Sequence, residues 1–90
     1  MPDPQPRHLL LYDYVEDVLE RRAPHREAHL AAIGTAREDG RILMAGPFDP
    51  PTGAAIVFAE REAAEAFARA DPYVTAGVVT NWRIETWMVL

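Results

Sequence analysis

The 90-residue sequence predicts an α+β fold in which two helices cover one face of a four-stranded antiparallel sheet. Three observations support this prediction. Four short segments are rich in apolar, aromatic and β-branched residues, as is typical of strands. Two other segments place apolar residues at helical spacing. The segments follow one another in the order β-α-β-β-α-β, which is the ferredoxin-like arrangement.

The first strand is expected over residues 8–15, HLLLYDYV. Residues 1–6 contain three prolines and are expected to form a flexible arm, so that a single domain spans residues 7–90. A chain of this length has room for one core only. Residues 16–22 are charged and predict either a helical turn or a loop.

The first long helix is expected to begin at Pro24, because the N–H that proline lacks has no partner at a first helical position. The apolar stripe that follows contains His29, Leu30, Ile33 and Ala36. Gly40 is expected to end the helix, since glycine readily adopts the left-handed conformation found at helix C-termini.

Strands are also predicted over residues 41–48 and 54–60, which are joined by the turn-forming residues DPPTG. Residues 61–70 are rich in strong helix formers and predict the second helix. Its apolar stripe consists of Ala64, Phe67 and Ala68. The alternating pattern over residues 80–90 predicts the last strand.

The second face of the sheet predicts a homodimer. In the first strand one face holds His8, Leu10, Tyr12 and Tyr14, and the other holds Leu9, Leu11 and Asp13. In the second strand, alternation places Ile42 with Met44 and Leu43 with Ala45. Four or five large apolar residues on the second face represent on the order of 10 kcal/mol of burial. We therefore expect two copies to pack sheet against sheet, and further assembly of such dimers stays open.

The amino-acid composition excludes several classes of function. The net charge is −5, and the nine basic residues, all arginine, are scattered, whereas nucleic-acid-binding domains gather them in one patch. The absence of cysteine excludes disulfides and thiol nucleophiles. There is no signal-peptide pattern and no apolar stretch long enough to cross a membrane. We expect a cytoplasmic protein that binds neither nucleic acid nor membranes.

Two histidines lie four residues apart on the first helix. This spacing can chelate a metal, but HREAH is not the metalloprotease pattern and no third ligand is evident, so we expect no metal. His25 is expected to be solvated. His29 borders the apolar stripe, where it is either a core-edge residue or a general acid/base, a role that suits an imidazole near neutral pH.

Asp71 precedes Pro72 and is expected to cap a helix by accepting a hydrogen bond from an N–H two or three residues later. A carboxylate has two oxygens and about four acceptor sites. One oxygen can therefore cap while the other accepts from His29, because both helices lie on the same face of the sheet. Tyr12 and Tyr14 favour packing, although their hydroxyls can also bond a ligand at a crevice rim.

Two segments, REAHLAAIGTAREDGRILMAGP over 26–47 and DPYVTAGVV over 71–79, resemble the YCII-related, or YciI-like, family. The resemblance implies a dimeric α+β barrel similar to muconolactone isomerase. It also implies an active-site pair of His29 and Asp71. A few characterised members of the family act on chlorinated aromatic or muconate-type compounds, for instance by dehydrochlorination.

These observations lead to a first hypothesis of a cofactor-free enzyme for a small cyclic or unsaturated acid, of isomerase, dehydrochlorinase or lyase type. His29 moves the proton and Asp71 orients it. The expected substrate-binding residues are Arg26, Gly46, Pro47, Tyr73 and Tyr12. A second hypothesis is a ligand-binding or regulatory module that uses the same pocket without chemistry. A third is a haem- or quinone-handling monooxygenase of the related barrel type.

Overall fold

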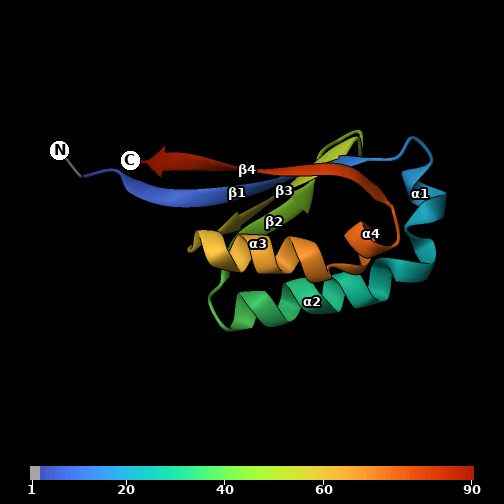
Figure 1. Cartoon of the computed structure of the whole chain (residues 1–90), viewed down its shortest axis with the longest axis horizontal. Coiled ribbons are helices and arrows are strands. Elements are labelled where there is room, and N and C mark those ends of the chain that lie inside the picture. The colour runs from blue at the N-terminus through green and yellow to red at the C-terminus, as the bar shows by residue number, and fades with distance from the viewer. Residues whose placement is uncertain (1–2) are drawn as a thin grey trace.

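The computed structural model of the protein describes residues 3–90 and shows a four-stranded antiparallel sheet with the strand order β2-β3-β1-β4. The strands are β1 (Gln5–Tyr14), β2 (Ile42–Pro47), β3 (Gly53–Phe58) and β4 (Val79–Val89). The two longest, β1 and β4, form one side of the sheet and extend together beyond the helices (Figure 1).

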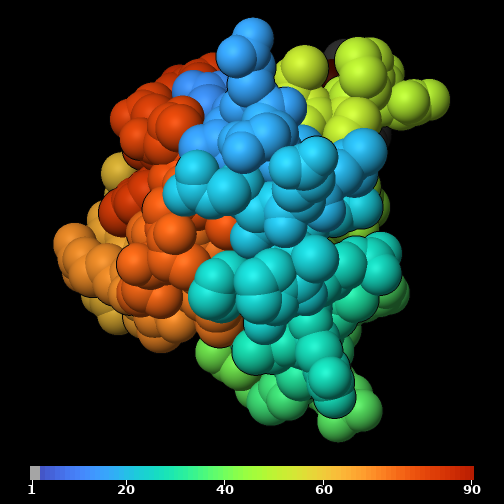
Figure 2. Space-filling view, turned by 90° about the vertical axis from the view of Figure 1, so that its right-hand side faces the viewer, coloured from blue at the N-terminus to red at the C-terminus, as the bar shows by residue number. Residues whose placement is uncertain are grey.

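The helices lie on one face of this sheet, which confirms the predicted ferredoxin-like α+β fold (Figure 1). The two long helices are α2 (Arg26–Glu38) and α3 (Arg61–Ala70). The short helices are α1 (Val18–Arg21), the 3-10 helix η1 (Ala23–His25) and α4 (Pro72–Thr75). Figure 2 looks onto the end of the molecule where α1, η1 and the start of α2 pack beside the α4 segment.

The first strand begins earlier than the sequence indicates. Gln5 and Pro6 pair with Val89 and Met88 of β4, so these two residues of the predicted arm belong to the sheet. The pairing of β1 with β3 starts only at His8, and before that point β1 is an edge strand, where proline is tolerated. Met1 and Pro2 lie outside the described residues.

The predicted alternation in the second strand is wrong. The register between β2 and β3 shifts between Ile42 and Met44, so Ile42 is buried while Met44 is 60% exposed. Ala45 then pairs with Ile56, which belongs to the core beneath the helices. A β-bulge of this kind places two residues opposite one and reverses the facing of those that follow. It aims Ala45 towards α2.

The core lies between the sheet and the long helices. Ala64, Phe67 and Ala68 of α3 are buried as predicted, and Gly40 has a φ of +83° after the end of α2. In the α2 stripe His29 and Ala36 are buried, but Leu30 is 48% exposed. The described residues include no helix long and apolar enough to cross a membrane.

Candidate active site

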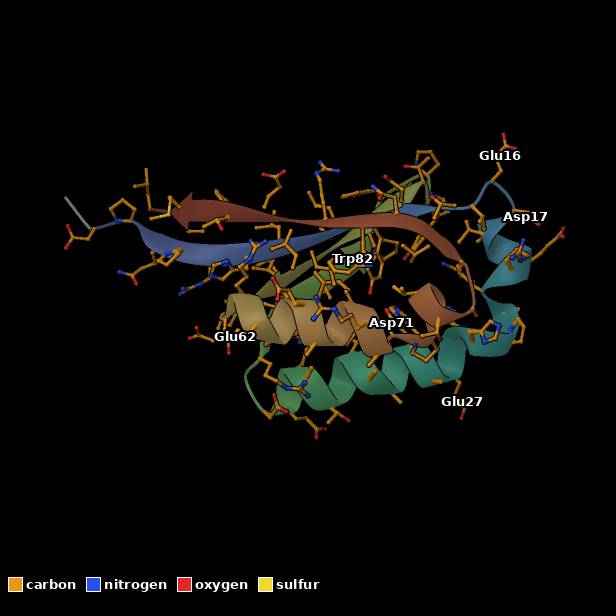
Figure 3. The ribbon with its side chains drawn as sticks, viewed as in Figure 1. Glu16, Asp17, Glu27, Glu62, Asp71 and Trp82 are labelled. Carbon is orange, nitrogen blue, oxygen red and sulfur yellow. The ribbon has the colours of Figure 1, made fainter. Side chains whose placement is uncertain are left out.

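Asp71 occupies the junction between α3 and α4. It follows the last residue of α3 and caps α4, where its Oδ1 accepts a hydrogen bond from the Tyr73 backbone N–H at 3.0 Å. The predicted cap is therefore confirmed. The side chain is 1% exposed and lies among the helices, whereas the labelled acids Glu27 and Glu62 point outward (Figure 3).

His29 reaches this carboxylate from α2. Its Nδ1 lies 2.8 Å from Oδ1 and 2.9 Å from Oδ2 of Asp71, and the imidazole is 7% exposed. The two residues are 42 positions apart in the sequence and meet because α2 and α4 pack together on the same face of the sheet. The structure thus brings together the His–Asp pair that the sequence predicts.

Tyr12 provides a third hydrogen bond to the same carboxylate. Its hydroxyl donates to Oδ2 of Asp71 at 2.7 Å, and the side chain is 1% exposed. The sequence favoured packing for Tyr12 but also included it among the expected substrate-binding residues, and the structure buries it beneath the site. Because both oxygens of Asp71 already accept from other donors, Nδ1 of His29 is the donor in the His–Asp contact. Its other ring nitrogen, Nε2, is then left for chemistry.

Tyr73 holds the plane of the imidazole. Its ring stacks on that of His29 with the centroids 3.7 Å apart and the planes within 7°. The sequence assigned Tyr73 to substrate binding, but it is 2% exposed and packs behind the histidine. Hydrogen bonding at Nδ1 and stacking on one face together restrict the ring to one orientation.

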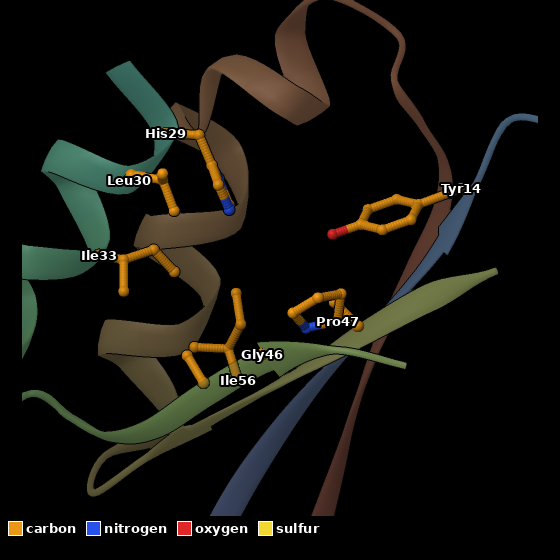
Figure 4. A pocket seen from close by; sticks show the side chains of 9 residues that line it. Tyr14, His29, Leu30, Ile33, Gly46, Pro47 and Ile56 are labelled. Atoms are coloured by element: carbon orange, nitrogen blue, oxygen red, sulfur yellow. The ribbon is translucent and has the colours of Figure 1, made fainter. Parts of the chain in front are cut away.

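The imidazole borders a cavity of about 150 Å³ between α2 and the β2–β3 edge of the sheet (Figure 4). A cavity of roughly this volume accommodates benzene. The lining residues are Tyr14, His29, Leu30, Ile33, Ala45, Gly46, Pro47, Ala54 and Ile56. Gly46 and Pro47 therefore lie where the sequence predicts, whereas Arg26 is exposed and outside this lining.

Tyr14 is a polar lining residue that the sequence favoured for packing, with ligand binding as the alternative, and that was not among the expected substrate-binding residues. It shares a strand face with Tyr12 but lies two residues nearer the end of β1, where its hydroxyl points into the cavity (Figure 4). Burial, and next the neighbouring Tyr73, raise the pKa of Tyr14 to about 12. Burial also raises the pKa of Tyr12, and Asp71 adds to this effect.

Comparison with known proteins identifies the family. The model of the YCII-related domain matches residues 7–88. The chain belongs to the YCII-related family. Protein YciI of Escherichia coli O6:H1 is 45% identical over 69% of this chain and 76% of that protein. An uncharacterized protein of Haemophilus influenzae is 35% identical over 74% and 81% of the two chains.

A solved structure has the same fold as this chain. It is 5-chloro-2-hydroxyhydroquinone dehydrochlorinase (TftG) from Burkholderia phenoliruptrix in complex with 2,5-dihydroxybenzoquinone. The TM-score is 0.74 at 22% identity, and the match covers 90% of this chain and 92% of that one. At this level of identity the likeness supports the α+β architecture.

The described residues around the site include no cluster of the kind that binds metals. Among residues 3–90, no three histidine or acidic side chains gather closely enough to hold a metal ion. Nδ1 of His29, the nitrogen that faces Asp71, is occupied by the hydrogen bonds described above.

The raised pKa values of the tyrosines predict that the folded protein loses stability at alkaline pH. Burial raises the pKa of all three in the folded state, to about 12 for Tyr14. In the unfolded chain they ionise near pH 10, at about the ordinary value. Between about pH 10 and 12 the folded state therefore binds more protons, so the free energy of unfolding falls as the pH rises. Denaturant unfolding across this range, with tyrosinate absorbance as a second signal, should show the fall. Full ionisation of the tyrosines near pH 10 in the folded protein would contradict this assignment.

Proposed function

We propose that the protein is a cofactor-free, small-molecule enzyme in which His29 transfers a proton to or from the substrate. The observation that supports this most strongly is the fixed imidazole, whose Nδ1 bonds to buried Asp71 while the ring borders a cavity. A histidine held in one tautomer by a carboxylate is the usual arrangement of a general acid/base. Asp71 orients the ring and stabilises the imidazolium that forms when Nε2 takes up a proton.

The proton step that this geometry supports begins at a C–H bond next to a carbonyl. The bond breaks, the proton passes to Nε2, and the electron pair forms a C=C bond while the carbonyl pair moves onto oxygen. In an isomerisation the proton returns to a different carbon. In an elimination the pair on oxygen re-forms the carbonyl, the C=C pair shifts towards the next carbon, and that carbon loses a leaving group such as chloride with its bonding pair. The imidazolium later releases its proton to water.

The cavity favours a small ring as substrate. Its volume is close to that of a site for benzene, and most of its lining is aliphatic. The similar fold of TftG, a dehydrochlorinase with 2,5-dihydroxybenzoquinone bound, supports the same class of ligand. We therefore propose a cyclic, oxygen-bearing or unsaturated compound, and an isomerase, dehydrochlorinase or lyase-type reaction.

Deuterium exchange tests the proton transfer without knowledge of the natural substrate. In D₂O, a ring carbon beside an oxygen-bearing carbon first takes up a deuteron while the C–O bond becomes a carbonyl. Loss of the original proton from that carbon to His29 then restores the ring, so that hydrogen is replaced by deuterium with no other net change. We expect the protein to accelerate exchange of the ring protons of 2,5-dihydroxybenzoquinone or resorcinol. The loss of the ring-proton signals is measured by proton NMR. His29→Gln should abolish the acceleration, and Asp71→Asn should reduce it by about 10²-fold or more, since general acid/base catalysis contributes typically 10²–10⁴-fold.

Thr75→Val is the matched control, because Thr75 is exposed and the substitution removes a hydroxyl of α4 that does not contact the Asp71 carboxylate. This variant should catalyse exchange at the wild-type rate. Saturable binding of either probe with no exchange above the protein-free rate would contradict the enzyme. It would favour instead a ligand-binding module that uses the same cavity.

We also propose that a second copy of the chain covers the open face of the sheet. The cross-strand pairs place a set of apolar residues on the side away from the helices. They are Leu9, Leu11, Met44, Ala55, Val57 and Trp87, and the ion pair of Arg83 and Glu85 on β4 lies on the same face. Trp87 is 50% exposed and Met44 60% exposed, and apolar surfaces of this kind mark interfaces between proteins.

A charge on the open face should therefore split the dimer. We expect the wild type to be a dimer at micromolar concentration by light scattering, and Leu9→Arg to be a folded monomer, because an arginine there would be buried in the interface. Leu19→Arg, on the exposed side of α1, is the control and should remain dimeric. A monomeric wild type, or a dimer that tolerates Leu9→Arg, would exclude this interface.

A further inference from the structure

We propose that Tyr14 is a second catalytic residue, whose hydroxyl donates a hydrogen bond to the substrate oxygen beside the carbon at which His29 moves the proton. This inference rests on the proposed function and extends it. It assigns the acidic partner of the histidine, and it requires a substrate with a hydroxyl or carbonyl oxygen next to the reacting C–H.

The first support is the position of the hydroxyl. Tyr14 and His29 enter the cavity from different elements, β1 and α2, and the phenol and the imidazole face the same space (Figure 4). Their side chains are the polar ones in a lining that is otherwise aliphatic, proline or glycine. A ring in this space lies between a proton acceptor and a hydrogen-bond donor.

The second support is that the Tyr14 hydroxyl makes no hydrogen bond to another residue in the part of the chain that the structure describes. The hydroxyl of Tyr12 donates its hydrogen bond to Asp71, and the ring of Tyr73 stacks on His29. Within residues 3–90, no fully buried polar side-chain atom lacks a hydrogen-bond partner. The Tyr14 hydroxyl has no side-chain or backbone acceptor among those residues, so it must be accessible from the cavity. A bound oxygen atom would be its partner.

The third support is the rigidity of the ring. Tyr14 packs edge-on against Tyr73, with the ring centroids 6.2 Å apart and the ring planes at 80°. The ring centroids of Tyr14 and Tyr12 are 6.5 Å apart. Tyr14 pairs with Val79 of β4 next to a register shift at which Thr80 of β4 is the extra residue, so β1 itself continues without interruption to Tyr14. Tyr73 therefore contacts both His29 and Tyr14 and sets one relative to the other.

The fourth support is the protonation state. With its pKa raised to about 12, Tyr14 keeps its proton at neutral pH and acts as a donor rather than a base. In the step described above, negative charge develops on the substrate oxygen as the C–H pair moves into the new C=C bond. A donor aimed at that oxygen in an apolar cavity stabilises the charge. Removal of one such donor costs about 10²–10³-fold in kcat in well-studied enzymes.

Tyr14→Phe tests the proposal because it keeps the ring and removes only the hydroxyl. In the deuterium-exchange assay with 2,5-dihydroxybenzoquinone and resorcinol, we expect the maximal exchange rate to fall by about 10²-fold. The melting temperature should stay close to that of the wild type. Affinity for fluorobenzene, a ring without oxygen, should be unchanged by fluorine NMR, whereas affinity for 4-fluorophenol should fall by about tenfold, the loss expected for one hydrogen bond.

The outcomes separate the two proposals. Exchange that is lost in His29→Gln but stays within about threefold of the wild type in Tyr14→Phe would overturn the role of Tyr14 and leave the proposed function intact. Equal loss of affinity for fluorobenzene and 4-fluorophenol would show that Tyr14 only shapes the cavity, and would also overturn it. Absence of exchange in the wild type with both probes would overturn the proposed function and the catalytic role of Tyr14 with it.

Discussion

The buried carboxylate of Asp71 is the constraint on which the site depends. A charge removed from water is costly unless it is paired and hydrogen-bonded. Asp71 meets this condition with three donors, the imidazole of His29, the hydroxyl of Tyr12 and the backbone N–H of Tyr73. These donors come from α2, β1 and α4, so the cost of burying one carboxylate fixes the relative positions of a strand and two helices. Loss of any donor would remove one of the hydrogen bonds that compensate the burial of this charge.

The same network leaves one side of the histidine open. Tyr73 covers a face of the imidazole and Asp71 holds Nδ1, while the ring borders the aliphatic cavity. Preorganisation of this kind allows a proton to move with little rearrangement of the protein. The aromatic side chains continue from Tyr73 to Tyr14, which brings a phenol to the same cavity. The chemistry that we propose thus follows from one arrangement of packed rings around one charge.

Local signals marked His29 and Asp71 as candidates and the family resemblance implied that they pair, but neither revealed the surroundings of the pair. The helical stripe placed His29 towards the sheet, and the Asp–Pro sequence marked a cap, so both partners were recognisable. Alternation showed that Tyr12 and Tyr14 share a face, but it does not tell which of them lies under α4 and which reaches the cavity. The bulge at Leu43 was invisible because Ile42, Leu43 and Met44 are all apolar and any register satisfies their hydrophobicity. Gln5 and Pro6 join the sheet through pairing with the distant β4, which composition does not reveal.

The tautomer of His29 tests the central claim most directly. Long-range proton–nitrogen correlation spectra distinguish a neutral imidazole protonated at Nδ1 from one protonated at Nε2. The spectra are recorded at about pH 9, where an ordinary histidine side chain is neutral. We expect the Nδ1–H form for His29 in the wild type, and a loss of that preference in Asp71→Asn, whose amide can also donate. A wild-type His29 protonated at Nε2 would contradict the account, because the nitrogen assigned to the substrate would then be blocked by its own proton.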